Sequence, residues 1–245
     1  MLVDGLVFVG TCRFGYELLP DAALAALDAV GMEKAIASPV HPVEGPMSSA
    51  NDRLLAAAQA AGGRLVPLCR IDPWDRDAPG EVARCQALGA KGVLLHPSEE
   101  HFRVADRRVK PIMQAAAALR LPVTIVAGFH LVAEPLQLGQ AASWAEAVPV
   151  LLTTGGQLNI SGLSLIDAKY AMAANPNLHL HSTGQYRQDF LEEVVGEYGA
   201  NRLLYASAAP VFEMAMERAR VGLTHLTQDE LAQVLGGNAA RLYGL

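Results

Sequence analysis

The sequence predicts an α/β fold, a single (β/α)8 TIM barrel spanning residues 1–245, and three observations support this. Short apolar runs alternate with helical patterns along the whole chain, which is typical of repeated strand–helix units around a parallel sheet. Eight such runs can be counted, which favours a closed barrel over an open sheet. The length of 245 residues falls in the range in which α/β barrels form one domain.

The eight apolar runs have the length and composition of buried strands. In chain order they are LVDGLVFV (2–9), KAIASPV (34–40), LVPLCRI (65–71), KGVLLHP (91–97), PVTIVAG (122–128), PVLLTT (149–154), NLHLHST (177–183) and RLLYAS (202–207). The functional face of a barrel is built from the loops that follow its strands. Any site is therefore expected among loops 10–20, 39–48, 97–105, 128–135 and 154–163.

Helix signals fall between these runs. Asp21 and Ser49 precede helical patterns and belong to the residue types that cap helix N-termini. Gly31 and Gly62 stand where the same two patterns stop, as expected of glycines that end helices. The first two helices are therefore predicted to begin at these caps and to end before these glycines.

Two later helices have less uniform signals. Asp106 opens a helical pattern, but Pro111 falls about one turn inside it, so this helix is expected to begin later or to kink. Thr227 precedes the last pattern and has Glu230 three residues on, which is a capping-box spacing.

Composition excludes several classes of partner. The 19 basic and 25 acidic residues give a net charge of −6 without long blocks of like charge, which argues against nucleic acid or an anionic membrane surface. No apolar run approaches the roughly 20 residues that span a bilayer, and no leader is recognisable. Three cysteines without CxxC spacing indicate neither a disulfide framework nor a zinc knuckle. A cytoplasmic protein is expected.

Residues 201–245, NRLLYASAAPVFEMAMERA…GGNAARLYGL, resemble the last strand and helix of the amidohydrolase-related metal hydrolases. That family usually carries an aspartate at the position of Ala208, where it ligates the metal and accepts a proton from the attacking water. Its first strand reads Asp followed by a His-x-His pair, whereas this chain reads Asp4-Gly5-Leu6-Val7-Phe8. Leu6 and Phe8 thus occupy the two histidine positions.

The resemblance extends to two further strands. The family's fifth strand ends LPV-x-x-H-x-G, and LPVTIVAG at 121–128 matches it except that Val126 replaces the histidine. The sixth commonly ends in histidine before glycine, where this chain has Thr154. Because five expected ligand positions lack a ligand, the resemblance implies a barrel that has lost its metal centre. No cofactor is expected.

His179 and His181 share one face of the seventh predicted strand, which places them in the barrel interior with the intervening leucines toward the helices. A relocated metal centre is one interpretation. The favoured one makes His179 a hydrogen-bonded residue of the core or the barrel floor and His181 a pocket residue, because no Asp, Glu or Cys of matching placement is evident nearby.

Polar residues at the strand ends are the remaining candidates for chemistry. His96 and His181 are the candidate catalytic residues. Four residues are candidates for ligand binding: Arg13, His130, Gln157 and Asn159. Arg13 would suit a carboxylate or phosphate. Ordinary loop hydrogen bonds are the competing explanation for each.

Other residues near the predicted mouth have structural interpretations. Arg70 and Asp72 are expected to pair at the rim, and Cys12 to pack as a small apolar residue under its loop. Three aromatic residues are expected as apolar walls or rim packing: Tyr16, Trp74 and Phe129.

Two functions remain open. The favoured one is a non-catalytic binding or partner scaffold with a small-molecule ligand, acting as a homodimer or beside an active paralogue. The alternative is a metal-independent hydrolase, lactonase or decarboxylase that uses His96 and His181 on a small anionic substrate. Relatives that resemble this second case generally keep the strand-eight aspartate as a base, and Ala208 removes it.

Overall fold

The computed structural model describes residues 1–156, 162–185 and 187–245. In this part of the chain, nine strands form one sheet in the order β2-β1-β3-β4-β5-β6-β7-β8-β9. All neighbours are parallel except the short β2, which pairs antiparallel with the end of β1. The predicted (β/α)8 barrel is confirmed, with β2 added inside the segment expected as a loop. The strands are β1 (Val3–Thr11), β2 (Glu17–Leu18), β3 (Lys34–Pro39), β4 (Leu65–Arg70), β5 (Gly92–Leu95), β6 (Val123–Ile125), β7 (Val150–Leu152), β8 (Leu178–His181) and β9 (Leu203–Leu204).

The barrel closes where β1 meets the segment that contains β9. Asp4 Oδ1 accepts a hydrogen bond from the Ser207 backbone N–H at 2.9 Å across this seam. A Cβ atom at Gly5 would lie 2.5 Å from the Tyr205 carbonyl oxygen, so glycine is required for the two backbones to approach. Three backbone hydrogen bonds complete the seam: Gly5 N to Tyr205 O at 2.9 Å, Ala208 N to Leu6 O at 2.8 Å and Phe8 N to Ala209 O at 2.8 Å.

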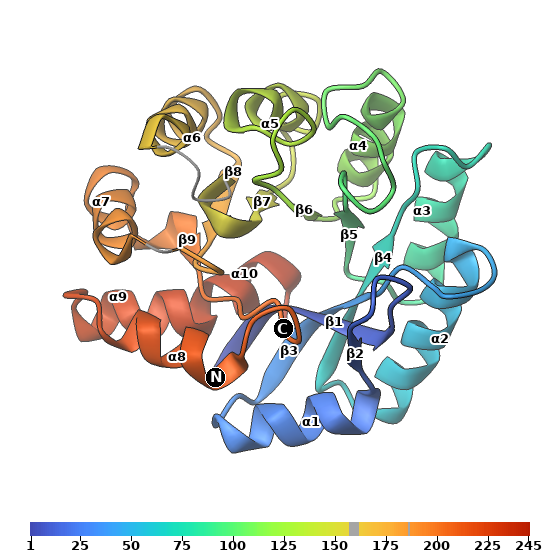
Figure 1. The fold of residues 1–245 in the computed structure, drawn as a ribbon, viewed down its shortest axis with the longest axis horizontal. Helices are drawn as coiled ribbons and strands as arrows, with labels where there is room; N and C mark the ends of the chain where they lie inside the picture. Colours follow the sequence, from blue (N-terminus) through green and yellow to red (C-terminus); the bar gives the residue numbers. More distant parts are fainter. Residues whose placement is uncertain (157–161, 186) are drawn as a thin grey trace.

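The helices lie around the outside of the strands (Figure 1). A continuous apolar layer packs between them and the outward faces of the strands. The helical segments are α1 (Pro20–Ala29), α2 (Met47–Ala60), α3 (Ala78–Ala87), α4 (Val109–Ala118), α5 (Pro135–Ala142), η1 (Thr153–Gly156), α6 (Gly162–Ala174), α7 (Gln188–Tyr198), η2 (Ala200–Arg202), α8 (Met214–Gly222), α9 (Gln228–Ala232), η3 (Gln233–Gly237) and α10 (Asn238–Tyr243).

The expected caps of the first two helices were wrong, although the helices themselves are present. Helix α1 begins at Pro20, which suits a first helical position, so Asp21 lies inside the first turn. Helix α2 begins at Met47, so Ser49 is also inside its helix. The predicted ends are confirmed, because Gly31 and Gly62 follow these helices with φ of 72° and 61°.

The predictions for the two later helices are confirmed. Helix α4 begins at Val109, after the Asp106 signal, and Pro111 then falls in the first turn, where its missing N–H is not needed. The capping box before α9 is confirmed. The Thr227 hydroxyl accepts from Glu230 N at 3.3 Å, and the Glu230 carboxylate accepts from Thr227 N at 2.8 Å.

Inside the barrel, inward apolar side chains form a second core. Its floor is closed by α10, which lies near the centre of the ring of helices in Figure 1. The Tyr243 hydroxyl from this helix lies 3.2 Å from Thr124 Oγ1 of β6. Burial raises the pKa of Tyr243 to about 12. In the described part of the chain, no helix combines the length and apolar character needed to cross a membrane.

Candidate functional site

A cavity of about 520 Å³ opens at the carboxyl ends of the strands. Phe8, Val126, Thr154 and Ala208 line it, and these are four of the five positions at which a metal ligand was expected. The fifth, Leu6, is fully buried and is not part of this wall. The other lining residues are Phe14, Tyr16, His96, Ser98, Glu99, Ala127, Phe129, Thr153, Thr183, Pro210, Val211 and Phe212. We call this space the mouth cavity.

Two residues of the cavity wall have left-handed backbone conformations. The φ angles of Thr154 and Ala208 are 51° and 53°, a region that non-glycine residues occupy at a cost of roughly 1–2 kcal/mol each. The Thr154 hydroxyl donates to the Ala127 carbonyl at 3.2 Å, and the Thr153 hydroxyl accepts from Ala127 N at 2.9 Å. These hydroxyls therefore fix the end of β6 against the start of η1.

Aromatic rings make up much of the wall. The Phe8 ring centroid lies 6.3 Å from that of Tyr16 and 6.0 Å from that of His96. The Phe129 ring lies 6.2 Å from His96 on another side. Tyr16 and Phe129 thus form apolar walls as expected, whereas Trp74 is half-exposed and packs under the Arg108 guanidinium at the rim.

His96 presents a single ring proton toward the cavity wall. Burial, reinforced by the nearby Arg70 charge, lowers the pKa of His96 well below its usual value, so the ring is neutral at pH 7. Its Nδ1 atom accepts from the Glu99 backbone N–H at 3.4 Å, which places the proton on Nε2. Nε2 lies 3.5 Å from Glu99 Oε1, a long contact that leaves this donor weakly used.

Glu99 connects several polar groups at the edge of the mouth cavity. Its Oε1 atom accepts a hydrogen bond from the Tyr16 hydroxyl at 3.0 Å, and its Oε2 atom is paired with Arg70. Burial, followed by the Glu99 charge, raises the pKa of Tyr16, so this hydroxyl stays protonated. The Glu99 side chain is 12% exposed and is thus within reach of a small molecule in the cavity.

Arg70 is fully buried behind this edge and is saturated by acceptors. Its guanidinium donates to Glu99, to Glu100 and to the Pro39 carbonyl oxygen. Burial raises the pKa of Glu100 to about 7, while Arg70 opposes this rise. The expected pairing of Arg70 with Asp72 was wrong, because Asp72 instead caps the backbone N–H of Trp74 at 2.9 Å.

His179 and His181 are buried and face the barrel interior, with Leu178 and Leu180 on the helix side. Burial lowers the pKa of His181 to about 3. Burial, together with a nearby positive charge, lowers the pKa of His179 to about 4. Both rings are neutral at pH 7. Among the described residues, neither nitrogen of His181 has a hydrogen-bond partner, and His181 does not line the mouth cavity.

Of the four candidate ligand-binding residues, the two that the structure describes do not line the mouth cavity. Arg13 lines an adjoining cavity of about 490 Å³, which shares Phe14 and Glu99 with the mouth cavity. His130 is 70% exposed, and its Nδ1 atom lies 2.6 Å from a Glu134 carboxylate oxygen. Gln157 and Asn159 lie outside the described residues. Of the candidate catalytic pair, the structure brings only His96 to the cavity.

Sequence reasoning missed Glu99, Glu100 and Phe212. The paired acids follow His96 by three and four residues, and the signal for them was the unneutralised arginine at the end of the third predicted strand. Nothing comparable in the sequence marked Phe212. Cys12 is buried as expected.

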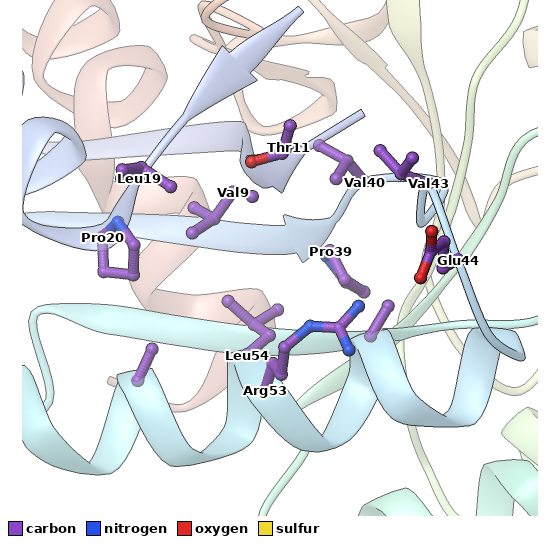
Figure 2. A pocket seen from close by; sticks show the side chains of 13 residues that line it. Val9, Thr11, Leu19, Pro20, Pro39, Val40, Val43, Glu44, Arg53 and Leu54 are labelled. Carbon is purple, nitrogen blue, oxygen red and sulfur yellow. The ribbon is translucent and has the colours of Figure 1, made fainter. Parts of the chain in front are cut away.

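A third cavity, of about 460 Å³, lies outside the barrel wall, between the ends of β1 and β3 and helix α2 (Figure 2). Arg53 extends from α2 toward Pro39 in this view, and Glu44 and Val43 lie at one side. None of the candidate site residues that the structure describes lines this cavity. We therefore centre the site on the mouth cavity.

The mouth cavity does not fit the metal that the resemblance implies. Four of the five expected ligand positions carry only hydrocarbon side chains, and the Thr154 hydroxyl donates to a carbonyl. Metal centres of this kind need three or more nitrogen and oxygen ligands at fixed distances. Among residues 1–156, 162–185 and 187–245, no group of three or more His, Cys, Asp or Glu side chains is placed to hold a metal ion.

Comparisons with known proteins agree with this architecture. The amidohydrolase family model matches residues 13–245. No curated protein matches the chain significantly.

Among solved structures, the chain is similar to an uncharacterized TIM-barrel protein from Bordetella bronchiseptica, with 19% identity, coverage of 99% of this chain and 98% of that chain, and a TM-score of 0.79. It is similar to an amidohydrolase with bound zinc from Burkholderia multivorans, with 18% identity, coverage of 100% of this chain and 99% of that chain, and a TM-score of 0.79. It is also similar to 5-carboxyvanillate decarboxylase from Sphingomonas paucimobilis, with 14% identity, coverage of 100% of this chain and 99% of that chain, and a TM-score of 0.76. At these identities the likeness concerns the fold.

Proposed function

The chain belongs to the amidohydrolase family, and from that premise we propose that it is a metal-independent member whose barrel mouth binds a small molecule without catalysing a reaction on it. One observation carries the proposal. Phe8, Val126, Thr154 and Ala208 form the wall of an open cavity at the face where barrel proteins hold their ligands. Hydrocarbon and hydroxyl groups at these positions suit binding and supply no ligand for a metal.

The size and lining of the cavity support a small-molecule ligand. Its volume of about 520 Å³ falls in the range of roughly 300–1,000 Å³ that is typical of small-molecule pockets. It combines aromatic walls with a few polar groups, His96 and Glu99 among them. This composition is the usual one for a pocket that binds and orients a compact organic molecule.

A second function is favoured by the His96–Glu99 contact. The Nε2–H group of a neutral histidine can donate a hydrogen bond to an oxygen on which charge develops in the substrate. The Glu99 carboxylate 3.5 Å away can accept a proton from an attacking water and then give it to the leaving group. This would support the metal-independent hydrolase, lactonase or decarboxylase alternative with His96 as the catalytic residue. His181 would not take part, because it lies away from the cavity.

Metal content and cavity-filling variants test the proposed binding function. The metal content of the purified protein is measured before any chelator is added, and a library of small molecules is then screened on the chelator-treated protein by ligand-detected NMR. We expect substoichiometric metal and hits that are lost in Val126→Phe, which fills the cavity, but kept in Val43→Phe, which makes the same exchange beside the outer cavity. Stoichiometric metal required for turnover would overturn the proposal. Metal-independent turnover abolished by His96→Gln would select the second function.

A further inference from the structure

We infer that the mouth cavity selects an uncharged aromatic molecule carrying a hydroxyl group, a phenol or aromatic alcohol, over its carboxylate counterpart. This rests on the proposed binding function and defines its ligand class. Three features of the cavity carry the inference: its aromatic walls, its charge and the polar pair at its edge.

The walls fit a flat aromatic body. Rings from four separate segments, Phe8, Tyr16, Phe129 and Phe212, line the cavity, and aliphatic groups such as Val126 fill the space between them. Aromatic pairs prefer offset or edge-to-face contacts, which rings arriving from several directions can provide to one planar guest. A flexible aliphatic ligand would lose more conformational freedom in the same space.

The charge of the cavity disfavours an anion. Among the described lining residues, Glu99 is the one that carries a charge at pH 7. The nearest arginine, Arg70, is fully buried and already donates to two glutamates and a carbonyl oxygen. Arg13 lines the adjoining cavity instead. A carboxylate in the mouth cavity would therefore approach Glu99, with no cation among the described lining residues to offset the repulsion.

The polar pair at the edge offers one donor and one acceptor side by side. His96 Nε2–H has only the 3.5 Å contact to Glu99 Oε1, and that oxygen already accepts from Tyr16. A ligand hydroxyl between them can accept from His96 and donate to Glu99, which satisfies both groups. An ammonium can only donate, so it would leave the His96 proton without an acceptor, but the Glu99 carboxylate and the aromatic walls would attract its charge. The discrimination that the cavity supports is therefore the one against a carboxylate.

Four probes with the same ring system separate these possibilities: 2-naphthol, naphthalene, 2-naphthoate and 2-naphthylmethylammonium. Their dissociation constants are measured by calorimetry on the chelator-treated protein near neutral pH. We expect 2-naphthol to bind at least about tenfold more tightly than 2-naphthoate, and more tightly than naphthalene. The ammonium probe, which Glu99 attracts, is expected to bind more tightly than 2-naphthoate. The wild-type panel decides the inference without any variant.

Two variants test whether Glu99 causes the preference for 2-naphthol over 2-naphthoate. Glu99→Gln removes the charge, so the preference for 2-naphthol over 2-naphthoate is expected to shrink by about threefold or more. Glu146→Gln makes the same exchange at an exposed glutamate, and the preference should stay unchanged.

The possible failures are distinguishable. If no probe binds, the proposed binding function for aromatic molecules fails together with the inference. If 2-naphthoate binds as tightly as 2-naphthol or as the ammonium probe and Val126→Phe abolishes that binding, the mouth cavity binds ligands but the inferred class is wrong. Binding of 2-naphthol that Val126→Phe leaves intact would place the site elsewhere and overturn both.

Discussion

The Tyr16 hydroxyl donates a hydrogen bond to Glu99 Oε1 at 3.0 Å, although 83 residues separate the two along the chain. The bond joins the segment between β1 and β2 to the loop after β5. It fixes the position of the carboxylate at the edge of the mouth cavity, where Arg70 holds the other oxygen.

Replacing Tyr16 by phenylalanine removes this bond and keeps the ring. Because Glu99 is charged and largely buried, we expect Tyr16→Phe to lower the free energy of unfolding by about 1–2 kcal/mol. Urea denaturation measures the change. Tyr170→Phe is the matched control, since Tyr170 is 65% exposed on α6 and should leave stability unchanged. Equal stability of the two variants would mean that the Tyr16 bond contributes nothing.

Removing the buried Arg70 should be far more damaging. In Arg70→Leu, Glu99 and Glu100 lose their common partner, and breaking a buried ion pair in this way typically costs about 3–5 kcal/mol. Glu100 limits the loss, because its pKa, already raised to about 7, rises further and the group becomes neutral. Denaturant unfolding of Arg70→Leu is compared with Arg53→Leu, an exposed arginine. A similar, small loss of stability in both variants would contradict the role of Arg70 as the common partner of Glu99 and Glu100.

His181 should make the protein sensitive to acid. Its pKa is about 3 in the folded chain and 6.5 as the ordinary value, so only the unfolded chain takes up this proton between those pH values. The stability contributed by the neutral ring is therefore fully present above pH 6.5 and is lost as the pH falls toward 3. We expect the unfolding free energy of wild type minus that of His181→Leu to fall by about 1.4 kcal/mol per pH unit below 6.5. A difference that is flat with pH would show that His181 does not titrate this way. Taking the difference cancels Asp4, whose pKa burial raises to about 6 and whose effect has the opposite sign.

Ala208 should tolerate glycine unusually well. Its φ of 53° lies in the left-handed region, where glycine avoids the steric cost that a Cβ atom brings. Ala208→Gly is expected to raise the free energy of unfolding by about 1 kcal/mol, measured by thermal and urea unfolding. Ala206→Gly, two residues earlier at a buried position without positive φ, should instead lower it by about 1 kcal/mol. If both variants changed the free energy of unfolding in the same direction, backbone strain at Ala208 would be excluded as the cause of the change.

Local patterns were enough to predict the barrel and several of its details. Period-two alternation placed His179 and His181 on the interior face, and the spacing of Thr227 and Glu230 gave the capping box. Both depend on residues close together in the sequence. The starts of α1 and α2 could not be fixed in this way, because Pro20 and the turn before Met47 override the capping preference of Asp21 and Ser49.

The site was predictable only in part, for a related reason. Strand ends mark which residues reach the functional face, and His96, Phe8, Val126, Thr154 and Ala208 do meet there. Which polar group pairs with which depends on loop conformation. Arg70 contacts acids that lie 29 and 30 residues away instead of Asp72, two residues on.

The seam between β1 and β9 has a consequence for synthesis on the ribosome. Asp4 and Ser207 meet across 203 residues, so one edge of β1, the first strand of the barrel to be made, stays unpaired until nearly the whole barrel has been translated. β2 covers only the end of β1, at Gly10 and Thr11. The nascent chain therefore carries an open strand edge throughout elongation, which is the kind of edge that chaperones shield and that pairs wrongly with other chains.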